Sequence, residues 1–347
     1  MIVRAHAHAR AGLLGNPSDG FFGKTIALEV RNFRATVTMW ESPWLEIVPN
    51  PAHDPTRFDS LDQLVARAQT EGYYGGLRLL LATCTRFASY CRAQGIALPA
   101  RNFTMVYETN IPRQVGLGGS SAIVCAMFRA LMKFYEVPEE RIPLPLLPRL
   151  LLEVESRELG IQAGLQDRVI VAYGGLVYMD FSRELMESQG HGRYERMDPA
   201  LLPRLFIAYG PPSAESGRAH NPVRFRWEQG DPEVRQAMEQ FASYAEQGKA
   251  ALQARDYETL GELMDKNFDL RRKVYGDEVI GERNLRLVNI ARSLGLPVKF
   301  PGSGGAVIGM YRSEEEWEKL REAYAAEGFE VVSVCPLAEE QAESGEQ

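Results

Sequence analysis

Residues 112–122 read PRQVGLGGSSA, a glycine loop that opens on a proline, ends in two serines and leads into an apolar stretch. The glycines permit backbone angles and close approaches that any side chain would block. The serine pair would begin a helix, where free N–H groups and the positive end of the helix dipole favour a bound anion. Because no Gly-Lys-Ser/Thr follows the glycines, the loop differs from the P-loop of the common nucleotidases. We therefore predict a phosphate-binding loop with contacts from Pro112, Gly116, Leu117, Gly118, Gly119, Ser120 and Ser121.

Strand and helix signals alternate on both sides of this loop. A strand at about 102–108 precedes it, and the helix that follows carries an apolar stripe at Ile123, Met127 and Leu131. The regular βα repeat of a doubly wound parallel sheet is absent, which favours the α+β class. The other predicted strands are about 2–14, 25–39, 176–181, 204–209, 298–300, 306–310 and 329–334, and the other predicted helices are about 75–95, 146–159, 167–173, 233–254, 256–274, 281–294 and 314–327.

The chain has 347 residues, more than one compact core normally contains, which predicts two domains. The pattern of apolar residues loosens near 190–203, where glycine, histidine and two prolines surround a polar stretch. We place the domain boundary there, so that residues 1–198 form the N-terminal domain and 199–337 the C-terminal domain. Residues 338–347, AEEQAESGEQ, are polar and acidic, and we expect them to be disordered.

Charge and composition narrow the range of partners and compartments. A net charge of −7 argues against nucleic acid or an anionic membrane as partner, because both attract basic surfaces. No apolar run approaches the roughly 20 residues of a membrane span, and MIVRAHAHAR at the start lacks the apolar core of a secretory signal. We therefore expect a cytoplasmic protein of open oligomeric state, with free thiols at Cys84, Cys91, Cys125 and Cys335.

Two further stretches accompany the glycine loop, ARAGLLGNPSD at residues 9–19 and FPGSGGAV at residues 300–307. In this order and spacing, the three stretches resemble the signature motifs of the GHMP kinases, which include galactose, homoserine, mevalonate and phosphomevalonate kinases. The resemblance implies a two-domain α+β fold with an N-terminal nucleotide-binding domain and a ferredoxin-like C-terminal domain. It also implies that ATP and its acceptor bind in the cleft between the domains.

Within this family the chain is similar to the glucuronokinase branch. The similarity lies in GLLGNPSD, GLGGSSAIV, ELGIQAGLQDRV, YGGLVYMDF, NFDLRRKVYGDE and KFPGSGGAV. It implies a kinase that uses ATP and Mg²⁺ to phosphorylate the anomeric hydroxyl of D-glucuronate, a small sugar acid. The motifs define the chemistry better than the acceptor, so galacturonate, a neutral hexose and a heptose phosphate stay open. A mevalonate diphosphate decarboxylase and a non-catalytic nucleotide sensor are further alternatives, which the NPSD turn and the complete set of motif residues disfavour.

The resemblance also assigns catalytic and metal-binding residues. Asp167, in AGLQD, matches the aspartate that accepts or orients the proton of the attacking hydroxyl. Arg10 matches the arginine that lies beside it and balances charge in the transition state. Mg²⁺ prefers oxygen ligands, and the resemblance offers the hydroxyl of Ser121 and the carboxylate of Glu155. Glu155 precedes Asp167 by 12 positions, the spacing found in galactokinases, and Glu158 is its competitor.

Substrate contacts are expected from the first motif and from arginines. Asp19 matches the aspartate that binds sugar hydroxyls in galactokinases. Asn16 stands where those enzymes carry a glutamate and is expected to bind sugar hydroxyls differently. Gly304 lies in the third motif, whose glycines are expected to pack against the phosphate-binding loop. A uronate has a carboxylate that neutral sugars lack, and a bidentate arginine is its natural partner. In order of preference, the candidates for that arginine are Arg271, Arg168 and Arg272, followed by Arg218.

Overall fold

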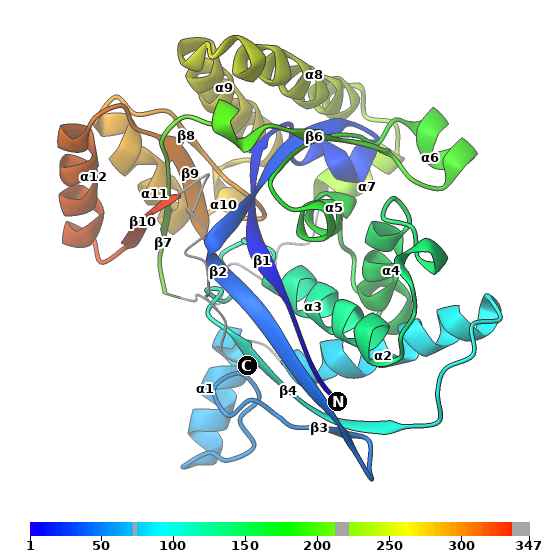
Figure 1. Cartoon of the computed structure of the whole chain (residues 1–347). Coiled ribbons are helices and arrows are strands. Elements are labelled where there is room, and N and C mark those ends of the chain that lie inside the picture. The colour runs from blue at the N-terminus through cyan, green and yellow to red at the C-terminus, as the bar shows by residue number, and fades with distance from the viewer. Residues whose placement is uncertain (72–74, 212–221, 335–347) are drawn as a thin grey trace.

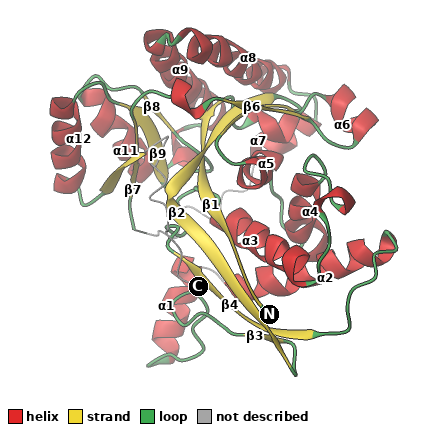
Figure 2. Ribbon diagram, in the orientation of Figure 1, coloured by secondary structure: helices red, strands yellow, loops and turns green. Residues whose placement is uncertain are grey.

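The computed structural model describes residues 1–71, 75–211 and 222–334, and it contains two sheets with helices packed against them (Figure 1, Figure 2). Helices and largely antiparallel strands are mixed, as the α+β prediction requires. Arg218, Cys335 and the acidic tail lie outside the described residues. Cys84, Cys91 and Cys125 are free thiols, as predicted.

The first sheet is built around one long antiparallel strand pair. β1 pairs along β2, and the other edge of β2 is shared by β4 and β5. Side chains of β1 alternate between exposed and buried as far as His8 and are all buried from Ala9 onward. The first motif therefore begins where this strand enters the interior. The strands are β1 (Ile2–Leu14), β2 (Lys24–Ser42), β3 (Glu46–Ile47), β4 (Asn102–Thr109), β5 (Leu176–Asp180) and β6 (Arg193–Met197).

Helix α3 follows the phosphate-binding loop and packs against β1 and β2, with α2 beside it (Figure 1). The predicted stripe of Ile123, Met127 and Leu131 is buried, and so are most residues between its members, so α3 is enclosed on nearly all sides. The helices of this part are α1 (Leu61–Glu71), α2 (Gly76–Ala93), α3 (Gly119–Phe134), α4 (Leu147–Glu153), α5 (Leu165–Tyr173) and α6 (Arg183–Gln189).

The second sheet is antiparallel in the order β10-β7-β9-β8. Its strands are β7 (Leu205–Tyr209), β8 (Val298–Lys299), β9 (Ala306–Met310) and β10 (Glu330–Val334), and its helices are α7 (Pro222–Glu228), α8 (Pro232–Ala254), α9 (Tyr257–Tyr275), α10 (Asp277–Ile280), α11 (Glu282–Ser293) and α12 (Glu314–Ala326). Helix α8 also packs on β1 and β2, and a Cβ added to Gly248 would lie 2.1 Å from Cδ1 of Leu14. The C-terminal helices therefore cover the end of β1 that carries the first motif.

Most predicted elements are present within a few residues, and the differences have physical causes. The predicted helix 146–159 divides into α4 and a π-helical turn, Val154–Glu158. The loosened stretch at 190–203 contains β6, which among the described strands pairs only with β5. Its side chains are mostly exposed, so it has little apolar periodicity. The domain boundary placed there stays a prediction. None of the described helices is both long and apolar enough to cross a bilayer.

Candidate active site

The three motifs are in direct contact through their backbones. The N–H of Arg10 donates to the carbonyl of Leu117 at 3.0 Å, and the N–H of Gly12 donates to the carbonyl of Pro301 at 2.8 Å. The first motif thereby hydrogen-bonds to the phosphate-binding loop and to the third motif. Segments that are far apart in the sequence form one set of loops.

Glycine is required where the third motif meets the phosphate-binding loop. A Cβ on Gly302 would lie 2.3 Å from the carbonyl oxygen of Gly116, and one on Gly305 would lie 2.7 Å from that of Gln114. A side chain cannot be accommodated at either position without moving backbone. Gly304 has a φ of +129°, but it does not line the pocket described below, so its predicted substrate contact stays a prediction.

The glycine loop leads into the N-terminus of α3, as predicted. Gly118 precedes the helix with a φ of +74°, and a Cβ there would lie 2.8 Å from Cγ of Arg10. Ser120 and Ser121 occupy the first turn, where backbone N–H groups lack helical partners. Within the described part of the chain, the buried Oγ of Ser121 has no hydrogen-bond partner. Buried hydroxyls are normally satisfied, so this one suits an oxygen ligand for Mg²⁺.

Arg10 and Asp167 form a bidentate ion pair. Nε and Nη2 of Arg10 donate to the two carboxylate oxygens of Asp167, each at 2.6 Å. Nη1 of Arg10 donates to the carbonyls of Gly116 at 2.6 Å and Pro301 at 3.1 Å. Arg10 is 4% exposed, whereas the side chain of Asp167 is 21% exposed. The cation is therefore held by two motif loops, while the carboxylate keeps an accessible face.

That face opens into a pocket of about 460 Å³, a volume that suits a small ligand. The pocket is lined by the first motif, the start of α3, the π-helical turn, the start of α5, helix α9 and the third motif. The predicted site residues that line it are Arg10, Asn16, Asp19, Ser120, Glu155, Asp167, Arg168 and Arg271. Most of the predicted catalytic and substrate residues therefore share one pocket.

Glu155 and Arg168, predicted for separate roles, form a buried ion pair with each other. Nη2 of Arg168 donates to Oε2 of Glu155, and both residues are less than 5% exposed. Arg168 also donates to the carbonyl of Gly164 at 3.0 Å and lies 3.7 Å from Asp167. The charge of Arg168 is already balanced, so its selection as a substrate ligand and the selection of Glu155 for Mg²⁺ stay predictions.

Asp19 lies in the short 3-10 helix Ser18–Phe21 and accepts a 3.4 Å hydrogen bond from the N–H of Gln166. Burial, followed by repulsion from Asp167, raises the pKa of Asp19 to about 6. Arg10 opposes this rise with a smaller effect. Asp19 therefore binds its proton more tightly than an ordinary aspartate does, in a pocket that it shares with Asp167 and Arg10.

Asn16 is buried and serves as a connector between loops. Its Nδ2 donates to the carbonyl of Phe300 at 3.2 Å, and its Oδ1 accepts a hydrogen bond from Nζ of Lys299 at 2.5 Å. Lys299 is itself 1% exposed and also donates to the carbonyls of Gly12 and Phe300. Burial lowers the pKa of Lys299 well below its ordinary value. Sequence analysis did not identify Lys299, because two of its three oxygen acceptors belong to residues 287 and 283 positions away, and no local pattern indicates them.

The remaining arginine candidates differ in their surroundings. Arg271, on α9, is 8% exposed and donates to the carbonyls of Gly302 at 2.7 Å and Ser303 at 3.4 Å. Arg272 points to the surface, where it forms a bidentate ion pair with Asp277. Arg271 therefore lines the pocket and Arg272 does not.

Gln166, Arg224 and Tyr275 also line the pocket, and sequence analysis did not predict them as site residues. Gln166 is 3% exposed, and its Oε1 has no hydrogen-bond partner among the described residues. Arg224, on α7, donates to the carbonyl of Gly20 at 3.0 Å, and Tyr275 ends α9 beside Arg271. Gln166 could have been found from its place beside Asp167 in AGLQD, whereas the other two depend on packing of distant helices.

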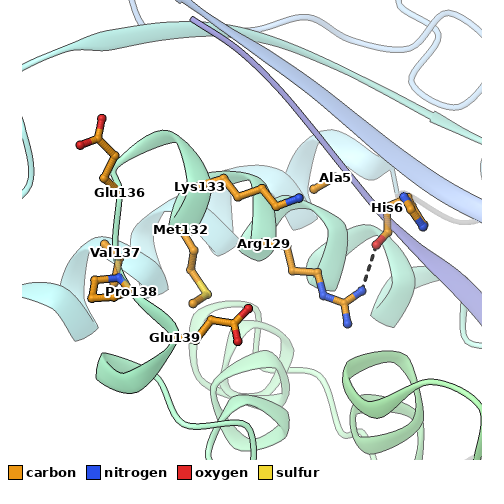
Figure 3. Close-up of a pocket in the computed structure, with 9 residues that line it drawn as sticks. All are labelled: Ala5, His6, Arg129, Met132, Lys133, Glu136, Val137, Pro138 and Glu139. Carbon is orange, nitrogen blue, oxygen red and sulfur yellow. Dashed lines mark hydrogen bonds between the residues drawn. The ribbon is translucent and has the colours of Figure 1, made fainter. Parts of the chain in front are cut away.

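A second pocket, of about 570 Å³, lies between the start of β1 and the second half of α3 (Figure 3). His6, Arg129 and Lys133 line it, and Arg129 donates to the carbonyl of His6 at 2.9 Å. No residue predicted for catalysis or binding lines this pocket. The chemistry is therefore assigned to the pocket beside Asp167.

Comparison with known proteins agrees with this geometry. Residues 79–175 match the model of the GHMP kinases N terminal domain, and residues 249–330 match that of the GHMP kinases C terminal domain. The chain is 50% identical to probable glucuronokinase 2 of Arabidopsis thaliana over 88% of this chain and 84% of the relative. It is 49% identical to glucuronokinase 1 of the same plant, with the same coverage of both chains.

Solved structures share the fold at low sequence identity. Mevalonate kinase from L. major, in complex with R-mevalonate, has a TM-score of 0.65 at 18% identity and covers 97% of both chains. Galactokinase from Lactococcus lactis, complexed with galactose, has a TM-score of 0.70 at 14% identity and covers 96% of this chain and 92% of its own. Together with the family models and the plant relatives, this fold shows that the chain belongs to the GHMP kinase family.

Proposed function

We propose that the protein transfers the γ-phosphoryl group of ATP to the anomeric hydroxyl of D-glucuronate, giving D-glucuronate 1-phosphate and ADP. The observation that carries this proposal is the Arg10–Asp167 ion pair, which faces a pocket bordered by the phosphate-binding loop. The choice of glucuronate is supported by the 50% identity to a probable plant glucuronokinase.

The pocket residues supply what phosphoryl transfer requires, namely positioning and charge balance. The anomeric oxygen attacks the terminal phosphorus, its proton passes to Asp167, and the bond from that phosphorus to the bridging oxygen of ADP breaks. Arg10 orients Asp167 through two hydrogen bonds and places positive charge beside the reacting atoms. The backbone N–H groups at the start of α3 donate hydrogen bonds to the phosphate oxygens.

Mg²⁺, when bound, would neutralise charge on the phosphates. Ser121 would hold it through its unpartnered Oγ, and Glu155 through a carboxylate that now pairs with Arg168. The oxygen chemistry of both side chains fits this ion.

Asp19 is proposed to bind sugar hydroxyls from the wall next to Asp167. Its carboxylate accepts a 3.4 Å hydrogen bond from the N–H of Gln166, at the start of α5. We further propose that the protein acts on small molecules and has no nucleic-acid or membrane partner. The boundary between its two domains is proposed near residue 198. The proposed location is the cytoplasm, and the free cysteines support this location.

The test is a substrate panel with Mg-ATP. D-Glucuronate, D-galacturonate, D-glucose, D-galactose and a heptose 7-phosphate are incubated separately, and the phosphate is located by ³¹P NMR. We expect an anomeric phosphate on glucuronate, at the highest kcat/KM of the panel. A preference for a neutral hexose or a heptose phosphate, or a phosphate at another position, would contradict the proposal.

A further inference from the structure

We propose that Arg271 binds the carboxylate of the sugar acid and is the residue by which this pocket distinguishes uronates from neutral hexoses. The inference rests on the function proposed above and assigns the recognition step to one side chain.

Arg271 is a buried cation whose hydrogen bonds end on neutral groups. Its guanidinium donates to the carbonyls of Gly302 and Ser303 and lies 5.2 Å and 5.3 Å from the ring centroids of Phe300 and Tyr275. Among the described residues, no carboxylate lies within ion-pair distance of it. Burial lowers the pKa of Arg271, which reflects the cost of keeping this charge away from water.

The other arginines that line the pocket differ in this respect. Arg10 is paired with Asp167, Arg168 is paired with Glu155, and Arg224 lies 3.9 Å from Glu228. The side chain of Arg224 is 35% exposed, so water already screens its charge. At Arg10 and Arg168, a substrate carboxylate would compete with a closely paired protein carboxylate. At Arg271 it would supply the missing anion, and a carboxylate matches the planar fork of a guanidinium.

The position of Arg271 also suits the shape of a hexuronate. In the pyranose form, the anomeric carbon and the carbon that bears the carboxylate flank the same ring oxygen, so the two groups must be recognised close together. Asp167, Asp19 and Arg271 line one pocket, and the charge of Asp19 interacts with both of the other two side chains. A sugar with its anomeric hydroxyl at Asp167 can therefore direct its carboxylate toward α9.

The guanidinium is held in place by the third motif. Gly302, whose carbonyl accepts the 2.7 Å bond from Arg271, approaches the phosphate-binding loop so closely that an added Cβ would lie 2.3 Å from the carbonyl oxygen of Gly116. A carboxylate bound to Arg271 is thus positioned relative to the phosphates through a short chain of backbone contacts. Correct placement of two reactants is the main source of rate in phosphoryl transfer.

The test compares Arg271→Gln, Arg271→Lys and the control Arg272→Gln on D-glucuronate and on D-glucuronamide, which has a neutral amide in place of the carboxylate. We expect wild type and Arg272→Gln to prefer glucuronate. Arg271→Gln should raise the KM for glucuronate about 30-fold or more, the size of a lost charge-assisted hydrogen bond, and should abolish the preference over glucuronamide. Arg271→Lys should keep part of that preference, because it retains the charge but loses the fork.

The outcomes separate this inference from the proposed function. If wild type phosphorylates glucuronate and Arg271→Gln loses activity equally on both sugars, Arg271 has only a structural role and the inference is wrong. The same conclusion follows if Arg271→Lys and Arg271→Gln both keep the wild-type preference. If wild type ignores glucuronate and phosphorylates a neutral hexose, the proposed function itself fails. Thermal unfolding and ATP binding by calorimetry show whether each variant is folded. If Arg271→Gln is unfolded, the preference of Arg271→Lys between the two sugars tests the inference by itself.

Discussion

The guanidinium of Arg10 and the carboxylate of Asp167 are joined by two hydrogen bonds of 2.6 Å, although 157 positions separate them in the sequence. The pair is asymmetric, because Arg10 is enclosed by two backbone carbonyls whereas Asp167 has an accessible side. A proton acceptor needs such access, and its buried cation needs such enclosure to stay in position. This asymmetry supports the predicted roles, with Asp167 as proton acceptor and Arg10 as the cation that positions it, and both roles stay predictions.

Replacing Asp167 by Asn keeps the shape of the side chain and removes its basicity. We expect kcat to fall by about 10³-fold, within the range found for lost general bases, while ATP binding persists. Coupled detection of ADP measures the first effect, and calorimetry with ATP measures the second. Asp62→Asn, on the exposed face of α1, is the control and should behave as wild type. An Asp167→Asn enzyme with full kcat would show that the carboxylate does not take the proton.

Ser121→Ala tests the unpartnered hydroxyl at the start of α3. Because Oγ of Ser121 has no hydrogen-bond partner in the described structure, its removal should leave the free energy of unfolding unchanged or slightly increased, since alanine favours helix. If the hydroxyl is an Mg²⁺ ligand, the Mg²⁺ concentration for half-maximal rate should rise about tenfold or more. Thermal unfolding and an Mg²⁺ titration at saturating ATP give the two readouts. An unchanged Mg²⁺ requirement would remove Ser121 from the metal site.

The loops of this site were predictable because their chemistry is local. Gly116 and Gly118 adopt positive φ angles, and the residues after them form the first turn of a helix, so the glycines and serines themselves indicate the geometry. The long strands were predictable from their alternation of apolar and polar residues. Edge strand β6 was not, because an exposed strand with a single partner imposes little pattern on its residues.

Contacts between charged side chains that are distant in the sequence could not be predicted from the sequence. Glu155 was selected by its spacing from Asp167, but its pairing with Arg168 depends on a π-helical turn that no residue pattern predicted. The sequence analysis ranked Arg271 above Arg272, but the physical reason for that order comes from the fold, in which Arg271 lines the pocket and Arg272 pairs with Asp277. Adjacent residues on a helix point in different directions, and only tertiary packing decides which is buried.

The Glu155–Arg168 pair can be separated from metal binding by a double substitution. Glu155→Gln alone leaves a buried guanidinium without its nearest carboxylate, and we expect a loss of about 3 kcal/mol in the free energy of unfolding. The double variant Glu155→Leu with Arg168→Met should be more stable than Glu155→Gln, because no charge stays buried at that position. If Glu155 also holds Mg²⁺, the double variant should stay inactive despite its recovered stability.

The matched control for this experiment is Glu158→Gln, which changes the competing glutamate at an exposed position of the same turn. Urea denaturation and an Mg²⁺ titration are measured for each variant. Glu158→Gln should match wild type in both measurements. A raised Mg²⁺ requirement in Glu158→Gln, with a normal one in the double variant, would transfer the metal role to Glu158.

Asp19 makes the stability of the protein depend on pH in a direction that its surroundings define. Burial and the charge of Asp167 raise its pKa from 3.8 to about 6 in the folded protein. The folded state therefore binds this proton more tightly than the unfolded state does. The contribution of Asp19 to the free energy of unfolding falls as pH rises from about 4 to about 6, and it is constant above that range. In Asp19→Asn this contribution is absent. The free energy of unfolding of Asp19→Asn, measured relative to wild type by urea denaturation, should increase by about 1 kcal/mol between pH 5 and pH 8. Asp62→Asn should show no such change, and a relative stability of Asp19→Asn that decreases over this interval would mean that Arg10 holds Asp19 ionised.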